Sequence, residues 1–286
     1  MNCLEVIRPG LMSTLQDGGR QGLAFYAIPA SGPMDCASAQ LANLLVGNPL
    51  DATLIECNVT PPRLLFRQST RIGLTGAEMR WQIDQQPAPL NRTLSVSAGS
   101  QLWGEPAARG MRGYVAIAGT IETTRSFGSS ACYALAQLGG NGGRPLSAGD
   151  VVCWQTGGPD EIVIELRSAA VANDPIVIEA IYGPEFDSLL AESQLLLTDR
   201  DFSVTSQSNR MGARLHGPML ETSRGLLDSL PVLPGMIQLL PSGQCIVVLR
   251  DGQTTGGYPR IAYLPGRSLD KFSQLRFQQP FRIAVN

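Results

Sequence analysis

Two glycine-bounded loops in the first half of the chain carry residues that could bind an anion. In residues 15–22, two glycines separate Asp17 from Arg20, so a carboxylate and a guanidinium can lie side by side while the glycines let a ligand approach. In residues 139–144, a glycine-dense run precedes Arg144, and backbone amides beside an arginine can form an anion nest. The structural alternatives are an Asp-Gly hairpin turn with an exposed arginine and a plain glycine-rich surface loop.

A second group of polar residues lies in the second half of the chain. Residues 250–259 join an apolar strand pattern to a turn rich in threonine and glycine. A carboxylate, an amide, two hydroxyls and a phenol lie close together there, at Asp251, Gln253, Thr254, Thr255 and Tyr258. A hairpin needs only about two or three turn residues, so this longer connection predicts a binding loop. Arg210 lies in a separate polar loop, four residues before a second arginine.

The ionisable residues exclude several other chemistries. Lysine and arginine together number 22, and only Lys271 is a lysine; His216 is the one histidine. No glycine-rich sequence precedes Lys271, which excludes a Walker-type phosphate loop. The six cysteines contain no C-x-x-C pair, so no metal site is predicted. His216 lies in a turn context and no serine has a G-x-S-x-G environment, which favours a structural or solvent-facing histidine over a catalytic triad.

Charge and hydropathy restrict the partners. The net charge is −2 and the arginines are scattered, so we do not expect nucleic acid as a partner. The apolar stretches fall short of the roughly 20 residues that a membrane span needs, and we expect no signal segment. These observations predict a cytoplasmic protein. Because the cysteines are widely spaced and lie in apolar contexts, we expect their thiols to be reduced.

Short β-branched runs bounded by turn-forming residues recur along the chain, which is typical of a mainly β fold built as barrels or sandwiches. We expect strands near residues 4–8, 71–75, 93–98, 113–118, 150–155, 161–167, 176–182, 202–207, 236–240, 245–250, 260–264 and 281–285. The small, polar segment Ser168–Pro175 lies between two strand patterns. It is the predicted boundary between domains 1–170 and 171–286.

Helices are expected to be few and short. The first follows an N-cap at Asp35 and places four apolar residues on one face: Ala37, Leu41, Leu44 and Leu45. A second should follow Gly183-Pro184. A third should begin at Ser268 and bury Leu269 and Phe272.

Seven segments, read together and in order, carry a resemblance to a known family. They are residues 15–20 (LQDGGR), 31–35 (SGPMD), 41–48 (LANLLVGN), 128–130 (GSS), 142–146 (GGRPL), 209–212 (NRMG) and 251–259 (DGQTTGGYP). They resemble the KipA family, which is the group of 5-oxoprolinase C subunits. It is also called the allophanate hydrolase subunit 2 or urea-amidolyase-related group of biotin-dependent carboxyltransferase domains. The resemblance extends over nearly the whole chain and implies two cyclophilin-like β-barrel domains with a few short helices.

The family also implies partners and an activity. It implies a hydrolase subunit that works with the KipI-like B subunit of 5-oxoprolinase and with an A subunit of lactam-utilisation type. Together they would use ATP to open the lactam of 5-oxoproline to glutamate, and which of the three binds ATP stays open. One alternative is a biotin-dependent carboxyltransferase component acting on urea or a related amide. Another is a KipA-type regulatory protein that binds a KipI-like kinase inhibitor.

By position, the resemblance transfers two groups of site residues to this chain. The substrate- or anion-binding group is Asp17, Arg20, Asp35, Asn43 and Arg144, and the catalytic group is Arg210, Asp251, Gln253, Thr254, Thr255 and Tyr258. The arginines would bind anions, the amide and hydroxyls would contact an amide or carbonyl, and Asp251 would act as a base or orienting group.

Some of these residues have competing structural roles, and one motif departs from the family. Asp35 is also a helix N-cap, and Asn43 falls inside that helix, so each has a structural alternative. Gly252 stands where the family commonly has an arginine, which leaves the exact substrate open.

Overall fold

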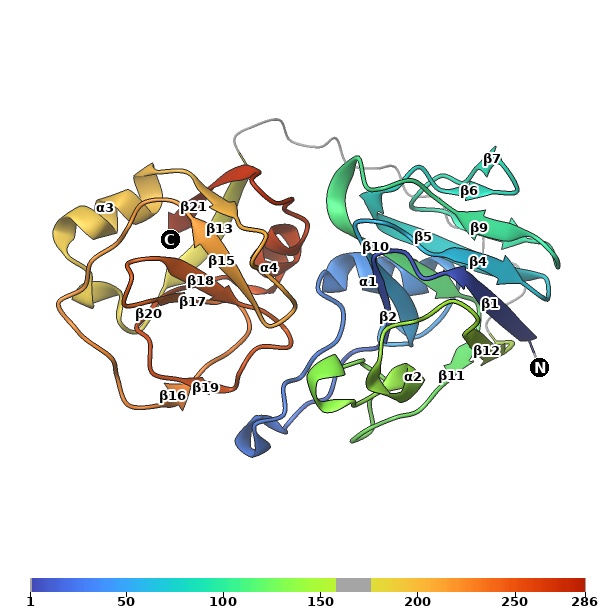
Figure 1. Cartoon of the computed structure of the whole chain (residues 1–286), viewed down its shortest axis with the longest axis horizontal. Helices are drawn as coiled ribbons and strands as arrows, with labels where there is room; N and C mark the ends of the chain where they lie inside the picture. The colour runs from blue at the N-terminus through green and yellow to red at the C-terminus, as the bar shows by residue number, and fades with distance from the viewer. Residues whose placement is uncertain (1, 158–175, 286) are drawn as a thin grey trace. The chain divides into compact units, whose positions relative to one another are not determined.

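The structure is a computed structural model, and it describes residues 2–157 and 176–285. The chain forms two compact units, Met1–Arg20 with Ser31–Ala169 and Gln21–Ala30 with Ala170–Asn286. Both units are built mainly of strands (Figure 1), which confirms the predicted fold class. The strand predicted at 161–167 and the boundary predicted at Ser168–Pro175 lie outside the described residues. The division into domains 1–170 and 171–286 therefore stays a prediction.

Within residues 2–157, the first unit packs two sheets against each other. One has the strand order β11 (Thr120–Glu122), β12 (Val151–Gln155), β1 (Asn2–Arg8), β4 (Arg63–Phe66), β9 (Gln101–Trp103), β6 (Gln82–Ile83) and β7 (Gln86–Pro87). The other has the order β2 (Met12–Gln16), β3 (Leu54–Asn58), β10 (Arg109–Ile117), β5 (Thr70–Glu78) and β8 (Thr93–Val96). The remaining elements are the 3-10 turn Ala134–Ala136, α1 (Cys36–Leu45) and α2 (Gly140–Gly143). The 3-10 turn Ala24–Tyr26 lies in the segment Gln21–Ala30, which belongs to the second unit.

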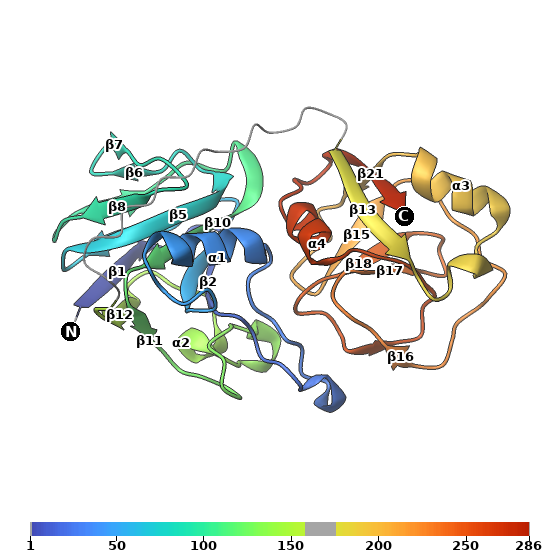
Figure 2. The same cartoon turned by 180° about the vertical axis from the view of Figure 1, so that it is seen from behind.

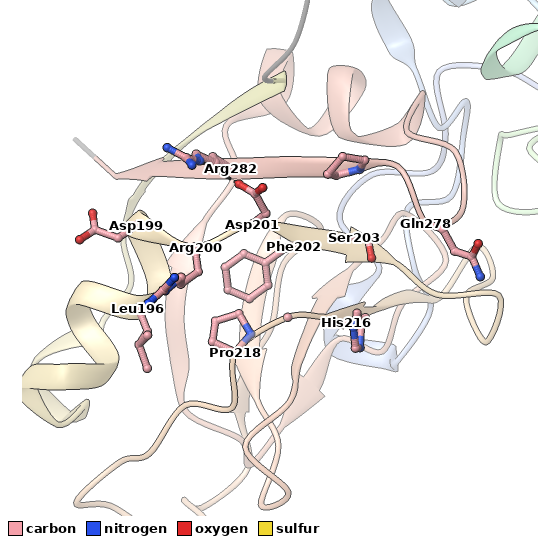
Figure 3. Close-up of a pocket in the computed structure, with 12 residues that line it drawn as sticks. Leu196, Asp199, Arg200, Asp201, Phe202, Ser203, His216, Pro218, Gln278 and Arg282 are labelled. Carbon is pink, nitrogen blue, oxygen red and sulfur yellow. Dashed lines mark hydrogen bonds and ion pairs between the residues drawn. The ribbon is translucent and has the colours of Figure 1, made fainter.

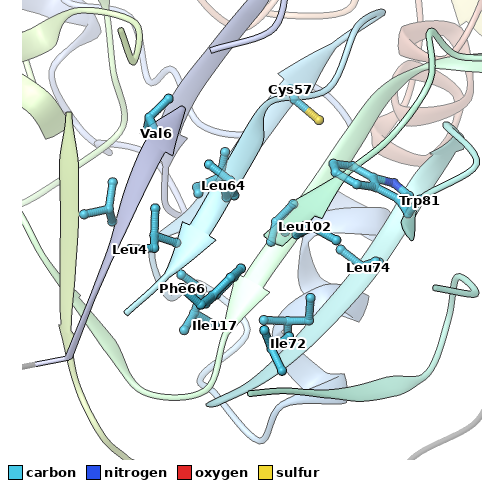
Figure 4. Packing of buried hydrophobic residues seen from close by; sticks show 14 of the residues in the cluster. Leu4, Val6, Cys57, Leu64, Phe66, Ile72, Leu74, Trp81, Leu102 and Ile117 are labelled. Atoms are coloured by element: carbon cyan, nitrogen blue, oxygen red, sulfur yellow. The ribbon is translucent and has the colours of Figure 1, made fainter. Parts of the chain in front are cut away.

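The hydrophobic core of the first unit lies between these sheets (Figure 4). Burial alternates along β1, where Leu4 and Val6 are fully buried and their neighbours are partly exposed, as the two-residue period of a strand requires. Phe66 and Trp154 meet edge to face in this cluster, with ring centroids 6.3 Å apart. The alternating apolar positions therefore explain why both sheets turn one face inward.

Helix α1 begins where predicted, but its buried face is different. The carboxylate of Asp35 accepts a hydrogen bond from the Ser38 backbone amide at 2.9 Å, which confirms the N-cap. The buried residues are Ala39, Ala42, Asn43 and Leu45, and Leu44 is 45% exposed. The helix lies across β5 and β10 (Figure 2) at Gly73, where an added Cβ would be 2.4 Å from the Ala42 carbonyl oxygen. So close an approach selects small residues for the contact. Of the predicted apolar face, Leu45 is buried and Leu41 partly buried, whereas the prediction was wrong for Ala37 and Leu44, which are exposed.

Among residues 176–285, the second unit is a closed barrel with a short ribbon beside it. The barrel order is β13 (Ile176–Tyr182), β20 (Arg260–Tyr263), β17 (Met236–Leu239), β18 (Cys245–Val248), β15 (Gly212–His216), β14 (Phe202–Val204) and β21 (Pro280–Val285). The ribbon pairs β16 (Leu230–Pro231) with β19 (Thr255–Gly256). The helices are α3 (Ala191–Asp199) and α4 (Gly266–Ser273), with a 3-10 turn at Phe186–Ser188.

The two helices predicted for this unit have different outcomes. The third predicted helix is confirmed as α4, in which Leu269 and Phe272 are buried. The second is wrong in form: only a 3-10 turn follows Gly183-Pro184, and the α-helix begins at Ala191. In the part of the chain that the structure describes, no helix is long and apolar enough to cross a membrane.

One pair of cysteines contradicts the predicted reduced thiols. Cys3 on β1 and Cys153 on β12 lie opposite each other in the antiparallel register and form a disulfide across 150 residues of sequence. Sequence spacing could not show that these two strands are neighbours. The other cysteines, Cys36, Cys57, Cys132 and Cys245, are thiols. Burial raises the pKa of Cys245 to about 12, which keeps that thiol protonated.

The disulfide should stabilise the first unit by restricting its unfolded chain. For a loop of 150 residues the chain-entropy effect is up to about 5 kcal/mol. Cys3→Ser should therefore lower the melting temperature measured by circular dichroism, and dithiothreitol should lower that of the wild type by a similar amount. Cys153→Ser and the double variant should lower the melting temperature as much as Cys3→Ser does, because all three variants lack the same disulfide. Unchanged melting in all three variants would contradict the pairing.

Candidate functional site

The Asp17 carboxylate holds a loop that is distant in sequence. Its Oδ1 accepts hydrogen bonds from the Gly19 amide at 3.0 Å, the Ser129 hydroxyl at 2.5 Å and the Ala131 amide at 3.2 Å. Its Oδ2 accepts from the amide and the hydroxyl of Ser130, at 2.7 and 3.0 Å. Asp17 therefore connects the turn after β2 to residues 129–131.

These contacts decide the protonation of Asp17. Burial alone would raise the pKa of Asp17, but the hydrogen bonds from Ser129, Ser130 and Gly19 outweigh burial and hold the pKa below its ordinary value of 3.8. A carboxylate that stays ionised and is saturated with donors is suited to positioning a loop. It is poorly suited to exchanging protons at neutral pH.

Arg20 reinforces the same connection from the interior. The side chain is 2% exposed, and its guanidinium donates to the Ala131 carbonyl oxygen. The sequence alternative of a turn with an exposed arginine is therefore wrong at this position. Gln16 adds a second contact, because its Nε2 donates to the Cys132 carbonyl oxygen at 3.2 Å. Two of the segments that carry the family resemblance, 15–20 and 128–130, are therefore in contact.

Asp35 and Asn43 lie near this loop, but their hydrogen bonds stabilise helix α1 and the segment that follows it. The Asp35 amide donates to the Tyr114 hydroxyl at 2.8 Å, in addition to the capping contact. The Asn43 side chain donates to the carbonyl oxygens of Leu50 and Ala52 at 3.3 and 2.9 Å. A cavity of about 70 Å³ is lined by Asp17, Pro33 and Asn43, among others. Three of the resemblance segments therefore contribute to one small cavity.

Arg144 is engaged by a carboxylate that the sequence did not single out. Its guanidinium donates to both oxygens of Asp150, at 2.7 and 2.8 Å. The hydrogen bonds from Arg144 lower the pKa of Asp150 to about 2. The amides of the preceding loop are also used: Gly140 donates to the Ser130 carbonyl oxygen and Asn141 to the Thr123 hydroxyl. Hydrogen bonds therefore hold this loop in place, and the Arg144 side chain is exposed at its end.

In the second unit, Arg210 and Asp251 form a nearly buried ion pair at the base of the 251–258 loop. Nε and one terminal nitrogen of Arg210 donate to the two Asp251 oxygens at 2.7 and 3.2 Å, and the side chains are 10% and 6% exposed. Gly252 fits tightly beside this pair. An added Cβ would lie 2.5 Å from Val248 Cγ1, so this backbone has no room for the arginine common in the family.

The rest of the loop presents an amide and hydroxyls above a buried glutamine. Gln253 and Thr255 are exposed, and Thr254 and Tyr258 are half-buried. The Gln253 Nε2 donates to Oε1 of Gln238, a fully buried residue on β17, at 3.2 Å. Gln238 is not among the site residues predicted from the sequence. The available signal was one polar residue inside the apolar strand 236–239.

A separate pocket of about 590 Å³ lies on the second unit (Figure 3). His216 lines it and is exposed, which confirms the predicted solvent-facing histidine. Asp201 and Arg282 form an ion pair at 2.8 Å in this pocket, and Ser203 lies opposite His216 in the β14–β15 pairing. None of the predicted site residues lines this pocket. Within the described ranges, no cluster of His, Cys, Asp or Glu side chains could hold a metal ion.

The chain is similar to a family model, to a known protein and to solved structures. Residues 26–285 match the model of the family described as carboxyltransferase domain, subdomain A and B. The chain is 35% identical over 280 residues to the C subunit of 5-oxoprolinase from Escherichia coli, and the match covers 97% of this chain and 89% of that protein. It is similar to the crystal structure of TTHA0988, with a TM-score of 0.90 and 30% identity, covering 99% of this chain and 56% of that one. It is also similar to the K. lactis urea amidolyase, with a TM-score of 0.91 and 26% identity, covering 99% and 18%.

The donors around Asp17 predict a pH-dependent contribution to stability. Because the pKa of Asp17 is lowered by folding, its contribution is complete above its ordinary value of 3.8 and is lost as the pH falls through the folded-state value. Asp17→Asn should lower the free energy of unfolding by about 3 kcal/mol at pH 7, because its amide NH₂ group would face hydrogen-bond donors. The deficit should shrink below pH 4 in urea titrations.

A matched control lies nearby. Asp51 is an exposed aspartate in the same cavity lining, and Asp51→Asn should change stability little at any pH. An Asp17→Asn deficit that is constant from pH 3 to pH 7 would contradict the positioning role.

Proposed function

Because the chain belongs to the family of carboxyltransferase domains with subdomains A and B, we propose that it is a subunit of an ATP-dependent 5-oxoprolinase. The complex would open the lactam of 5-oxoproline to glutamate. The observation that carries this proposal is the similarity to the C subunit of 5-oxoprolinase from Escherichia coli over nearly the full length of both chains.

That relative is named as one subunit of an enzyme, which supports a chain that acts within an assembly. We propose that its partners are the KipI-like B subunit of 5-oxoprolinase and an A subunit of lactam-utilisation type. The complex would use ATP, and the small-molecule amide would be bound with the help of this chain. We place this assembly in the cytoplasm.

The chemistry of lactam opening suits the groups in the 251–258 loop. Attack on an amide carbonyl develops negative charge on its oxygen, and prearranged donors stabilise that charge. The exposed Gln253 amide and Thr255 hydroxyl are such donors, while the Arg210–Asp251 ion pair keeps the loop in place. In the first unit, Asp17 and Arg20 would act by holding residues 129–131, and Arg144 would bind an anion at the surface by exchanging its ion pair with Asp150.

A second candidate is a biotin-dependent carboxyltransferase component acting on urea. The similarity to the K. lactis urea amidolyase favours it, because the match covers 99% of this chain with a TM-score of 0.91. Both reactions stabilise negative charge on an amide-like oxygen, so the same loop would serve either substrate. Biotin would enter only in this second case, on a separate carrier.

The proposal is tested by glutamate release from 5-oxoproline in a mixture of this chain with its two partners, with and without ATP. Thr255→Val keeps the branched shape of an exposed strand residue and removes its hydroxyl. It should lower kcat/KM about 10²-fold, whereas Thr255→Ser should stay near the wild type.

His216→Ala, in the separate pocket, is the matched control and should leave turnover unchanged. A stable complex that releases no glutamate would exclude the 5-oxoprolinase function. ATP- and carboxybiotin-dependent carboxylation of urea by that complex would then support the second candidate. The absence of both reactions would favour the regulatory alternative.

A further inference from the structure

Under the 251–258 loop lies a buried glutamine whose side-chain oxygen accepts a hydrogen bond and whose side-chain nitrogen has no acceptor in the part of the chain that the structure describes. Gln238 lies on β17 between Ile237 and Leu239, and its side chain is 0% exposed. Burying an amide without hydrogen bonds costs roughly 1–3 kcal/mol, so each end of this group should have a partner. Oε1 accepts a hydrogen bond from Gln253, but Nε2 has no hydrogen-bond partner among the described residues.

The open Nε2 faces the backbone of Gly256. A Cβ added at residue 256 would lie 3.0 Å from Gln238 Nε2 and 3.4 Å from Val232 Cγ2. Gly256 does not have a positive φ, so its backbone conformation would accept other residues. The missing side chain, and not an unusual backbone, is therefore what lets the Gly256 backbone lie this close to the donor.

The neighbouring polar groups of the loop are paired, which isolates this one donor. The Thr254 carbonyl oxygen accepts from the Val232 amide at 2.8 Å, and the Gly257 carbonyl oxygen accepts from the Leu227 amide at 2.8 Å. The Asp251 carboxylate is paired with Arg210. The loop is thus held along its length, while both hydrogens of Gln238 Nε2 stay without an acceptor within residues 2–157 and 176–285.

We propose that Gln238 Nε2 donates a hydrogen bond to a carbonyl or carboxylate oxygen of a small ligand that enters beside Gly256. Gln238 is then a specificity-determining residue, and Gln253 orients it by donating to the opposite end of its amide. This inference rests on the proposed function, in which the ligand oxygen belongs to the lactam of 5-oxoproline.

Entry of the ligand requires a small movement of the loop. Nε2 is shielded from solvent, and β19 covers it, paired with β16 at Leu230–Gly256 and Pro231–Thr255 and flanked by one backbone hydrogen bond on each side. So short a ribbon separates at little energetic cost. Ligand binding should therefore change hydrogen exchange at Leu230 and Gly256 in the wild type.

Three substitutions separate ligand binding from a purely structural role. Gln238→Met retains the volume without a donor, and Gly256→Ala places a methyl group about 3.0 Å from Nε2, where it would block a ligand oxygen. Each should raise KM for 5-oxoproline about 10- to 100-fold in the assembled complex, with a smaller effect on kcat. In Gln238→Glu the carboxyl group can donate only when protonated, so KM should rise with pH over a range where the wild type is constant.

The control is Gly225→Ala, because an added Cβ there meets nothing within 4 Å. It should leave KM unchanged. Circular dichroism and gel filtration would show that every variant folds and assembles, and Gly256→Ala tests the site without altering Gln238 if Gln238→Met does not fold.

The outcomes separate this inference from the proposed function. If the wild-type complex turns over 5-oxoproline and the variants keep its KM and pH profile, the role of Gln238 is overturned and the function stands. If the wild type has no turnover, the proposed function is wrong. The role of Gln238 in ligand binding is then tested by calorimetric titration with 5-oxoproline and with urea. Weaker binding of either compound by the variants would support the site; equal binding, or no binding by the wild type, would overturn it.

Discussion

The Asp17 carboxylate accepts hydrogen bonds from its own turn and from a loop 112 residues further along the chain. This connection joins the turn after β2 to a loop that follows β11, and the Arg20 guanidinium is buried beside it. A buried carboxylate without such donors would be strongly destabilising. The turn and residues 129–131 therefore stabilise each other.

In the second unit, buried carboxylates likewise accept hydrogen bonds, with arginine side chains as the donors. Arg210 pairs with Asp251 below the candidate loop, and Arg260 pairs with Glu185 at its far end, at 2.8 Å. Hydrogen bonds from Arg260 lower the pKa of Glu185 and keep that carboxylate ionised. A planar guanidinium can donate two hydrogen bonds to one carboxylate, which a lysine cannot match in geometry. This pairing gives a structural reason for arginine in place of lysine at positions 210 and 260.

The loop between these two ion pairs combines rigidity with access. Its ends are held by charge pairs, and its middle, β19, is attached to the 227–232 segment by a short ribbon and two flanking backbone hydrogen bonds. Gln238 lies beneath that ribbon with its amide oriented by Gln253. An exposed loop with firm ends can present donors in a fixed arrangement and still admit a small ligand, which is what an amide-opening or carboxyl-transferring site requires.

The sequence by itself determined the mainly β class, the positions of strands such as β13 and β21, the N-cap of α1 and the family, because these depend on local patterns and on motifs. Short or polar strands such as β2 and β4 were missed, since their patterns are weak. Only the tertiary structure decided which face of α1 is buried, that Cys3 meets Cys153, and that Gln238 lies under Gly256. Each of these depends on which strands become neighbours, and strand pairing is set by long-range packing that no local window of sequence contains.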